Sequence, residues 1–209
     1  MRRLFLIRHG ETSQNREGRM VSTQDPPLSP EGQRQIQTLA PYLMRWPIEA
    51  IITSPMRRCQ ETAELLAGGR NGLISVDERL REIGFGAIEG LTPAEIDQAG
   101  LGDIFRSWRQ GYPVRYPEGA ESFDAAAERM SSAYREVTEQ HDCAVIVGHS
   151  HSLRILLADS VLGVGVEAHR RMRLFHGSFT EIQWEGAAPR LTALNSWGPG
   201  LQGPQKMAH

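Results

Sequence analysis

The stretch Leu4-Phe5-Leu6-Ile7-Arg8-His9-Gly10-Glu11 decides the fold. Its first four residues form a short apolar run, which predicts a buried β-strand. An arginine and a histidine follow where this strand ends, and a glycine opens the turn. Ligand sites in open α/β sheets form at the carboxyl ends of strands, where Arg binds phosphate oxygens and a neutral His can attack phosphorus. The stretch therefore indicates phosphoryl transfer through a phosphohistidine.

Strands and helices alternate along the rest of the chain. Apolar or alternating runs predict strands over residues 3–7, 50–53, 73–76, 143–147, 172–175 and 179–184. Capping residues and apolar periodicity predict helices over residues 29–46, 56–67, 122–140 and 153–162. Residues 79–119 are rich in Gly and Pro and predict an insertion with short helices. The pattern favours the α/β class, a three-layer α/β/α sandwich with a mostly parallel central sheet and a late antiparallel part.

Length and composition narrow the organisation of the chain. The 209 residues are 40% hydrophobic and 23% charged, as in an ordinary globular protein. We expect a single domain over residues 1–198 and a flexible C-terminal tail over residues 199–209. We see no linker that would divide the domain.

Charge and hydropathy exclude several function classes. The net charge of -2 argues against nucleic acid as a partner, because nucleic-acid binders are usually clearly basic. No apolar run approaches the roughly 18 residues of a membrane span, and the N-terminal strand leaves no room for a signal peptide. Cys59 and Cys143 lack metal-ligand spacing, so we interpret them as reduced thiols of a cytoplasmic protein. The sequence alone leaves a disulfide between them open.

Three predicted strand ends carry groups that suit one anion. Arg8 and His9 follow the first strand, Arg58 lies one helical turn beyond Ser54, and His149 follows the strand over residues 143–147. Helix N-termini at these ends would add backbone N–H donors and positive dipole. Phosphoryl transfer needs such positive charge, because the equatorial oxygens stay charged throughout. Together these residues predict a phosphate pocket.

At this point the sequence resembles a known family. Five segments, in family order, are similar to the motifs of the histidine phosphatase superfamily, also called phosphoglycerate mutase-like: residues 6–12 with Asn15, and residues 54–63, 80–90, 119–122 and 147–150. The resemblance runs from residue 4 to about 197, and it implies the phosphoglycerate mutase-like fold. Val21-Ser22 and Ser150-His151 depart from the commonest family pattern, which leaves the substrate open.

The resemblance also implies roles for the acid and the nucleophile. Neutral His9 would attack phosphorus through one ring nitrogen while a backbone carbonyl holds the other. Glu82 would protonate the leaving alkoxide and then act as base on the water that cleaves phosphohistidine. The first of these tasks requires either a raised pKa of Glu82 or a proton delivered with the substrate.

The same resemblance implies how phosphate is held. Arg8, Arg58 and His149 would bind the non-bridging oxygens. The other expected phosphate-binding residues are Asn15, Ser22 and Ser150. Neither a metal nor a cofactor is expected, because the arginines and histidine neutralise the charge.

The leading hypothesis is a phosphoric monoester hydrolase of the histidine acid phosphatase type, acting on a small phosphorylated metabolite. The alternatives are a cofactor-dependent phosphoglycerate mutase and a non-catalytic phosphate-binding module. A homodimer is also open. His151 could pair with His149 as a metal site, but a helix begins there, and no acidic residue stands nearby in the sequence. Arg154 either reaches the far end of the substrate or faces solvent, and a solvent-facing or structural role is the preferred expectation. The cluster at residues 170–173 either recognises an acidic group or protects an edge strand.

Overall fold

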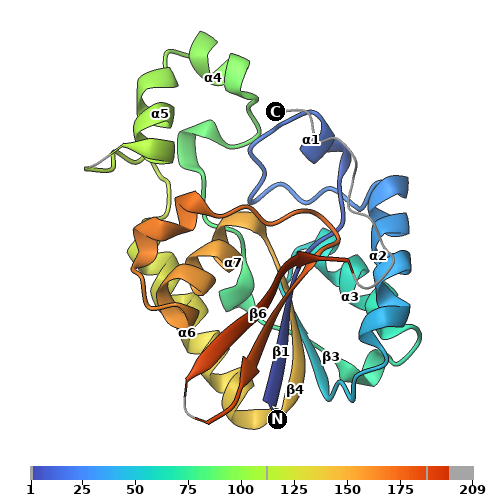
Figure 1. Ribbon diagram of the computed structural model, residues 1–209. Helices are drawn as coiled ribbons and strands as arrows, with labels where there is room; N and C mark the ends of the chain where they lie inside the picture. Colours follow the sequence, from blue (N-terminus) through green and yellow to red (C-terminus); the bar gives the residue numbers. More distant parts are fainter. Residues whose placement is uncertain (1, 112, 187, 198–209) are drawn as a thin grey trace.

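The computed structural model describes residues 2–111, 113–186 and 188–197. Within them, the central sheet has six strands in the order β3-β2-β4-β1-β5-β6 (Figure 1). The strands are β1 (Arg2–Arg8), β2 (Ala50–Thr53), β3 (Ile74–Val76), β4 (Cys143–Gly148), β5 (Phe179–Trp184) and β6 (Pro189–Ser196). The pairs β3-β2, β2-β4 and β4-β1 are parallel, whereas β1-β5 and β5-β6 are antiparallel. The predicted mostly parallel sheet with a late antiparallel part is confirmed.

Helices cover both faces of this sheet, and further helices lie beyond the ends of its strands. The α-helices of the described residues are α1 (Ser13–Arg16), α2 (Pro30–Leu43), α3 (Arg57–Ala67), α4 (Pro93–Gln98), α5 (Gly102–Gln110), α6 (Phe123–Gln140) and α7 (Ser150–Leu156). In Figure 1, α2 and α3 lie on one side of the sheet and α6 and α7 on the other, while α4 and α5 lie beyond its end. The arrangement is the predicted three-layer α/β/α sandwich.

The sequence of β1 explains why the sheet sits between two layers. Leu4 and Leu6 belong to the core cluster shared with α6 and α7. Phe5 and Ile7, which point to the opposite face, belong to the cluster shared with α2 and α3. A strand buried on both faces has a continuous apolar run, as here. A third cluster, centred on Phe85, Trp108 and Phe123, anchors the insertion to α6.

Close backbone approach at the end of β1 requires glycine at two positions. A Cβ on Gly10 would lie 2.6 Å from the carbonyl oxygen of Gly32, and a Cβ on Gly32 would lie 2.1 Å from that of Glu11. Both distances are far inside van der Waals contact, so any side chain would push the two segments apart. The first turn of α2 is thereby held directly against the turn that follows β1.

Two predicted helix ends were misplaced. Helix α2 ends at Leu43 rather than near residue 46, two residues beyond Pro41, which cannot donate to the preceding turn. Helix α7 begins at Ser150 rather than at residue 153, with His149 as its N-cap residue. Histidine is not among the preferred N-cap residues, and His149 makes no capping hydrogen bond, so no cap marked this start. The earlier start brings the N-terminus of α7 to the end of β4.

The predicted strand over residues 172–175 was wrong. This segment is irregular, because its backbone groups bind side chains: Arg8 Nη1 donates to Leu174 O (2.6 Å) and Asn195 Oδ1 accepts from Phe175 N–H (2.9 Å). The last strand is instead β6, which the sequence analysis missed. The residues before it form a 3-10 helix, Val166–Arg171, so the interpretation of residues 170–173 as a charged edge strand was also wrong.

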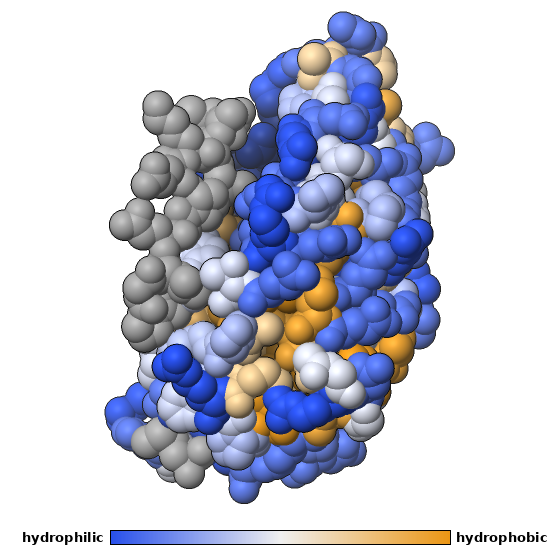
Figure 2. Space-filling model, turned by 90° about the vertical axis from the view of Figure 1, so that its right-hand side faces the viewer, coloured by the Kyte–Doolittle hydropathy of each residue, from blue (hydrophilic) through white to orange (hydrophobic). Residues whose placement is uncertain are grey.

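The surface and the cysteines complete the description. Figure 2 shows a mostly hydrophilic face with hydrophobic residues gathered in its lower half. Cys59 and Cys143 are both buried free thiols, which answers the question of a disulfide. None of the helices in the described part of the chain is long and apolar enough to cross a membrane. The expected tail, residues 199–209, lies outside the described residues.

Candidate active site

The carboxyl ends of β1, β2 and β4 bring four predicted side chains together. Arg8 pairs in register with Gly148, and Thr53 with Val147, so the residues that follow these strands leave the sheet side by side. The rings of His9 and His149 lie 5.2 Å apart between centroids. We call Arg8, His9, Arg58 and His149 the strand-end cluster.

His9 is held in one tautomer. Its Nδ1 lies 2.7 Å from the carbonyl oxygen of Gly10, and because a carbonyl only accepts, Nδ1 must carry the hydrogen. This is the backbone contact that the sequence analysis expected, and it leaves a lone pair on Nε2. Burial lowers the pKa of His9 well below its usual range, and the nearby Arg58 and His149 lower it further. His9 is therefore neutral and nucleophilic near neutral pH.

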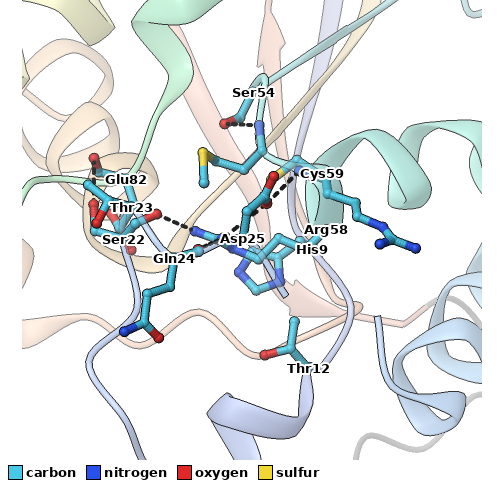
Figure 3. A network of polar contacts seen from close by, with 12 residues as sticks. His9, Thr12, Ser22, Thr23, Gln24, Asp25, Ser54, Arg58, Cys59 and Glu82 are labelled. Atoms are coloured by element: carbon cyan, nitrogen blue, oxygen red, sulfur yellow. Dashed lines mark hydrogen bonds and ion pairs between the residues drawn. The ribbon is translucent and has the colours of Figure 1, made fainter. Parts of the chain in front are cut away.

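Arg58 is buried, with 1% of its side chain exposed, although it carries a full charge. It donates to the carbonyl oxygens of Gln24 (2.8 Å) and Ser22 (3.0 Å), and Figure 3 shows it beside His9 with these loop residues around it. The Nε–H groups of Arg58 and Arg8 are buried without an acceptor among the described residues. Buried donors are normally satisfied, so two orphaned arginine donors point to an oxyanion.

His149 approaches the same place from β4. Its Nε2 lies 2.8 Å from Ser54 Oγ and 3.4 Å from Cys59 Sγ. Burial lowers its pKa well below the usual range, and Arg58 adds to the lowering, although Glu82 opposes it. The cluster thus combines two neutral imidazoles with the buried Arg58 and the half-buried Arg8. Arg58 Nη1 lies 3.7 Å from Asp25 Oδ1, a half-exposed carboxylate, and the remaining positive charge suits an incoming anion.

Glu82 is buried at the N-terminus of α7, where backbone N–H groups surround its carboxylate. Oε1 accepts from Ile83 (3.1 Å) and Ser152 (2.9 Å), and Oε2 accepts from His151 (3.1 Å). Burial raises the pKa of Glu82, but the hydrogen bonds from the side chain and backbone of His151 outweigh this and hold the pKa well below its usual range. Of the two options expected for its acid role, the raised resting pKa is therefore wrong.

The other expected phosphate-binding residues occupy different places. Asn15 Oδ1 accepts from the N–H (3.1 Å) and the hydroxyl (2.9 Å) of Thr12, so it caps α1 and keeps only its Nδ2 donors for a ligand. Ser22 is buried between Arg58, which binds its carbonyl, and Glu82, whose carbonyl accepts from Ser22 Oγ at 3.4 Å. Ser150 opens α7 at the wall of a cavity.

His176 is a site residue that the sequence analysis missed. It is buried, its ring lies 5.2 Å from that of His9, and its Nδ1 donates to the His9 carbonyl at 3.1 Å. Burial lowers its pKa well below the usual range, and Arg8 lowers it further. Because it lies in an irregular loop, no periodic pattern marked it. Thr62 was also missed; its hydroxyl accepts from the Gly10 N–H at 3.2 Å and ties α3 to the end of β1.

A cavity of about 390 Å³ opens beside the strand-end cluster. We call it the side cavity. Arg8 and Ser150 form the wall nearest the cluster, and Trp108 and Arg109 of α5 form the wall of the insertion. Arg154, Arg170 and Arg173 also line it; the remaining lining residues include Met20, Phe105, Phe123, His151, His169 and Phe175.

The structure shows what Arg154 and His151 contact, which the sequence left open. Arg154 is structural as well as lining the cavity, because it donates to the carbonyl oxygens of Ser150, His169 and Met172. His151 turns away from His149 toward Glu82, whose Oε2 lies 3.6 Å from His151 Nδ1, so an acid does stand near it in space. No group of three or more His, Cys, Asp and Glu side chains in the described part of the chain could hold a metal ion.

Comparison of this chain with known proteins identifies its family and several relatives. The family model described as histidine phosphatase superfamily (branch 1) matches residues 4–196. A Hydrogenobacter thermophilus protein provisionally named phosphoserine phosphatase 2 is 31% identical, over 93% of this chain and 96% of its own. A Cronobacter sakazakii protein provisionally named phosphoglycerate mutase is 33% identical, over 88% and 86%.

Solved structures of phosphatases superpose on nearly the whole of this chain. The α-ribazole phosphatase from Shigella flexneri superposes with a TM-score of 0.84 at 27% identity, covering 96% of this chain and 100% of that one. A mycobacterial glucosyl-3-phosphoglycerate phosphatase, solved with VO3, superposes with a TM-score of 0.82 at 30% identity, covering 94% and 100%.

Proposed function

This chain belongs to the histidine phosphatase superfamily, and we propose that it is a metal-independent phosphomonoesterase that hydrolyses a small phosphorylated metabolite through a phosphohistidine. Relatives that are named as phosphatases, among them those for phosphoserine, α-ribazole phosphate and glucosyl-3-phosphoglycerate, support phosphatase activity on this fold. They differ in substrate, so the chemistry is argued from this chain's own residues.

In the first step, the Nε2 lone pair of His9 attacks phosphorus and the bond from phosphorus to the ester oxygen breaks. Arg8, Arg58 and His149 hold the non-bridging oxygens, and the orphaned Nε–H groups of the two arginines gain acceptors. The departing alkoxide takes a proton from Glu82. Because Glu82 rests as a carboxylate, this proton arrives with the substrate, whose negative charge also raises the pKa of the carboxyl.

In the second step, Glu82 is a carboxylate again and acts as a base. It takes a proton from water, the water oxygen bonds to phosphorus, and the bond from phosphorus to His9 Nε2 breaks. Inorganic phosphate leaves, His9 returns to its neutral tautomer, and Glu82 releases the proton with the phosphate or to water, which restores its carboxylate. The N–H donors around Glu82 suit this step, because they stabilise the charged form of the base.

The observation that carries the proposal is the bond from His9 Nδ1 to Gly10 O. It fixes the tautomer in which Nε2 is free to attack, and it does so beside the buried Arg58 and the half-buried Arg8. A structural histidine at a strand end would have no need of such neighbours.

The proposal is tested by phosphate release from p-nitrophenyl phosphate and a panel of metabolite phosphates, with excess EDTA present throughout. Rapid quenching with labelled substrate should trap acid-labile, base-stable phosphate on residue 9. Activity that disappears with EDTA and returns with a divalent ion, or a wild-type rate equal to that of His9→Ala, would refute it. Isomerisation of 3-phosphoglycerate in the presence of 2,3-bisphosphoglycerate, without release of phosphate, would instead identify a mutase.

A further inference from the structure

The side cavity is strongly positive. Five arginines, Arg8, Arg109, Arg154, Arg170 and Arg173, line it, and no Asp or Glu is among its lining residues. Low-dielectric walls such as the aromatic rings of Phe105 and Trp108 strengthen the field of charges at their surface. Such a cavity favours a leaving group that carries negative charge.

Three of these arginines have partners among the described residues. Arg170 Nη1 lies 3.1 Å from Glu167 Oε2 and donates to Gly111 O, whereas its Nε and Nη2 donors are buried without an acceptor among the described residues. The Nε and Nη1 groups of Arg154 donate to three backbone carbonyl oxygens. Arg8 belongs to the strand-end cluster and donates to Leu174 O.

Arg109 and Arg173 have no ion pair within the described ranges. Arg109 lies on α5 with its guanidinium 5.4 Å from the Phe105 ring centroid. Arg173 lies across the cavity from the insertion, in the irregular loop whose backbone Asn195 holds through the carbonyl of residue 173 (2.7 Å). Burial lowers the pKa of Arg154 to about 10, Glu82 opposes this, and the charges of Arg109 and Arg173 contribute to the lowering. Both side chains therefore lie close enough to Arg154 for their charges to act on it.

Trp108 supplies an independent sign of a ligand in this cavity. It is only 2% exposed, and its indole Nε1–H is buried with no acceptor among the described residues. A buried indole N–H usually finds a partner. An oxygen of a bound molecule would provide one, and Trp108 lines the cavity in which that molecule would lie.

Resting on the proposed function, we propose that the side cavity binds a leaving group that carries a second anion, a carboxylate or a further phosphate, held by Arg109 and Arg173. The scissile phosphoryl group occupies the strand-end cluster, and the second anion lies on the far side of Arg8. Arg109 and Arg173 come from separate segments and form a clamp around it. The enzyme therefore selects phosphoesters whose leaving group carries a second anion over esters of neutral alcohols.

The test compares two phosphoesters that differ only in the second anion. The inhibition constants of 3-phosphoglycerate and glycerol 3-phosphate are measured against hydrolysis of p-nitrophenyl phosphate, since a competing substrate also inhibits. Phosphoserine and phosphoethanolamine form a second matched pair. In the wild-type protein the acid of each pair should bind roughly 10- to 100-fold more tightly, as expected for hydrogen bonds to a charged group.

The double variant Arg109→Gln/Arg173→Gln should bring this ratio close to one. The inhibition constant of glycerol 3-phosphate should rise much less than that of 3-phosphoglycerate, because its phosphate is held by the strand-end cluster. The matched control is Arg106→Gln/Arg171→Gln, which removes the same charge from α5 and from the segment before residue 173. Arg106 pairs with Asp103 at 2.7 Å, and neither control residue lines the cavity. The control should retain the wild-type ratio.

Equal inhibition constants within each pair, or an unchanged ratio in the double variant, would overturn the second-anion site while leaving the phosphatase proposal intact. If p-nitrophenyl phosphate is not hydrolysed at all, the proposed function fails. In that case titration calorimetry with the same four compounds tests the second-anion site separately. Tighter binding of the acids in the wild-type protein, lost in the double variant, supports the site, and equal binding of acids and neutral esters refutes it.

Discussion

The strand-end cluster and the side cavity both use arginine and histidine, but they support them differently. His9, Arg58 and His149 are buried and fixed by backbone or neighbouring side chains at the ends of core strands. Arg109 and Arg173 are exposed, one on a short helix of the insertion and one in a loop. The first region resists change because the core holds it, whereas the second can vary without disturbing the sheet.

This difference separates reaction from selection. A reaction needs groups held within fractions of an ångström, and rigid elements provide that precision. Selection among substrates needs only complementary charge and shape, which loops and insertions on a rigid scaffold commonly provide. Variants of the cluster should therefore change the rate on all phosphoesters, and variants of the cavity should change the choice between them.

The largest expected effect is that of His9→Ala. Removing the nucleophile should lower kcat on the order of 10⁴-fold or more for all substrates alike, because no neighbouring group can form the covalent intermediate. Stopped assays of phosphate release measure it, with circular dichroism and melting to verify folding. A variant that retained activity on some esters and lost it on others would break the distinction between the two regions.

Glu82→Gln should have the next largest effect, and it should depend on the leaving group. Loss of a general acid costs typically 10²–10⁴-fold, so hydrolysis of alkyl phosphates should fall by about that factor. p-Nitrophenyl phosphate should lose much less in its first step, because its phenolate leaves without a proton. Burst kinetics separate the two steps. The matched control is Glu78→Gln, which changes an exposed acid in the same segment.

Equal losses on both substrate types would show that Glu82 acts only by holding the N-terminus of α7. Its carboxylate accepts from Ser152 and His151, so part of any loss in stability would have this structural origin. The free energy of unfolding of Glu82→Gln must therefore be measured beside its rates.

The strand-end cluster was largely predictable from sequence. Strands such as Leu4-Phe5-Leu6-Ile7 are apolar on both faces, and residues that follow such strands meet at one edge of a parallel sheet. The five motifs then gave the family and its order. Local sequence rules sufficed because backbone hydrogen bonding fixes the register of β1, β2 and β4, and with it the place of His9 and His149.

What the sequence could not give depends on contacts between distant segments. The N–H groups that hold Glu82 come from residues about 70 positions later, and they became available only because α7 starts earlier than its sequence suggested. The same holds for the irregular segment over residues 172–175, where the side chains of Arg8 and Asn195 replace strand pairing. The sorting of Arg109 and Arg173 from the other arginines required knowing which cations already have partners.

Acid pH should lower the free energy of unfolding through the histidines of both regions. His9, His149 and His176 of the first region and His151 and His169 of the second all have pKa values lowered by burial, to about 4 for His151. In the unfolded chain histidine titrates near 6.5, so below that pH the unfolded state binds more protons. The free energy of unfolding should therefore fall from pH 6.5 toward pH 4, by up to about 1.4 kcal/mol per pH unit for each histidine.

Urea denaturation at pH 7, 6 and 5 measures this fall. Replacing His169 by Asn should reduce the slope, since one group with a lowered pKa is removed. A free energy of unfolding that rises or stays constant between pH 7 and pH 5 would mean that these histidines are protonated in the folded protein. It would then also contradict the neutral His9 on which nucleophilic attack depends.

The smallest effect sharpens the boundary between the two regions, because His176 lies at the junction. Its Nδ1 holds the His9 carbonyl, and the Gly177 N–H donates to the Arg8 carbonyl at 3.3 Å, so this loop braces the end of β1. Losing one such hydrogen bond should lower kcat about 10-fold in His176→Leu, with KM for p-nitrophenyl phosphate changed less.

His176→Asn can place an amide donor near the Nδ1 position and should recover most of the rate. If Asn and Leu are equally impaired, His176 must act through its other ring nitrogen on the substrate. Since the same loop carries Arg173, a changed preference between 3-phosphoglycerate and glycerol 3-phosphate in His176→Leu would show that cluster and cavity share one support.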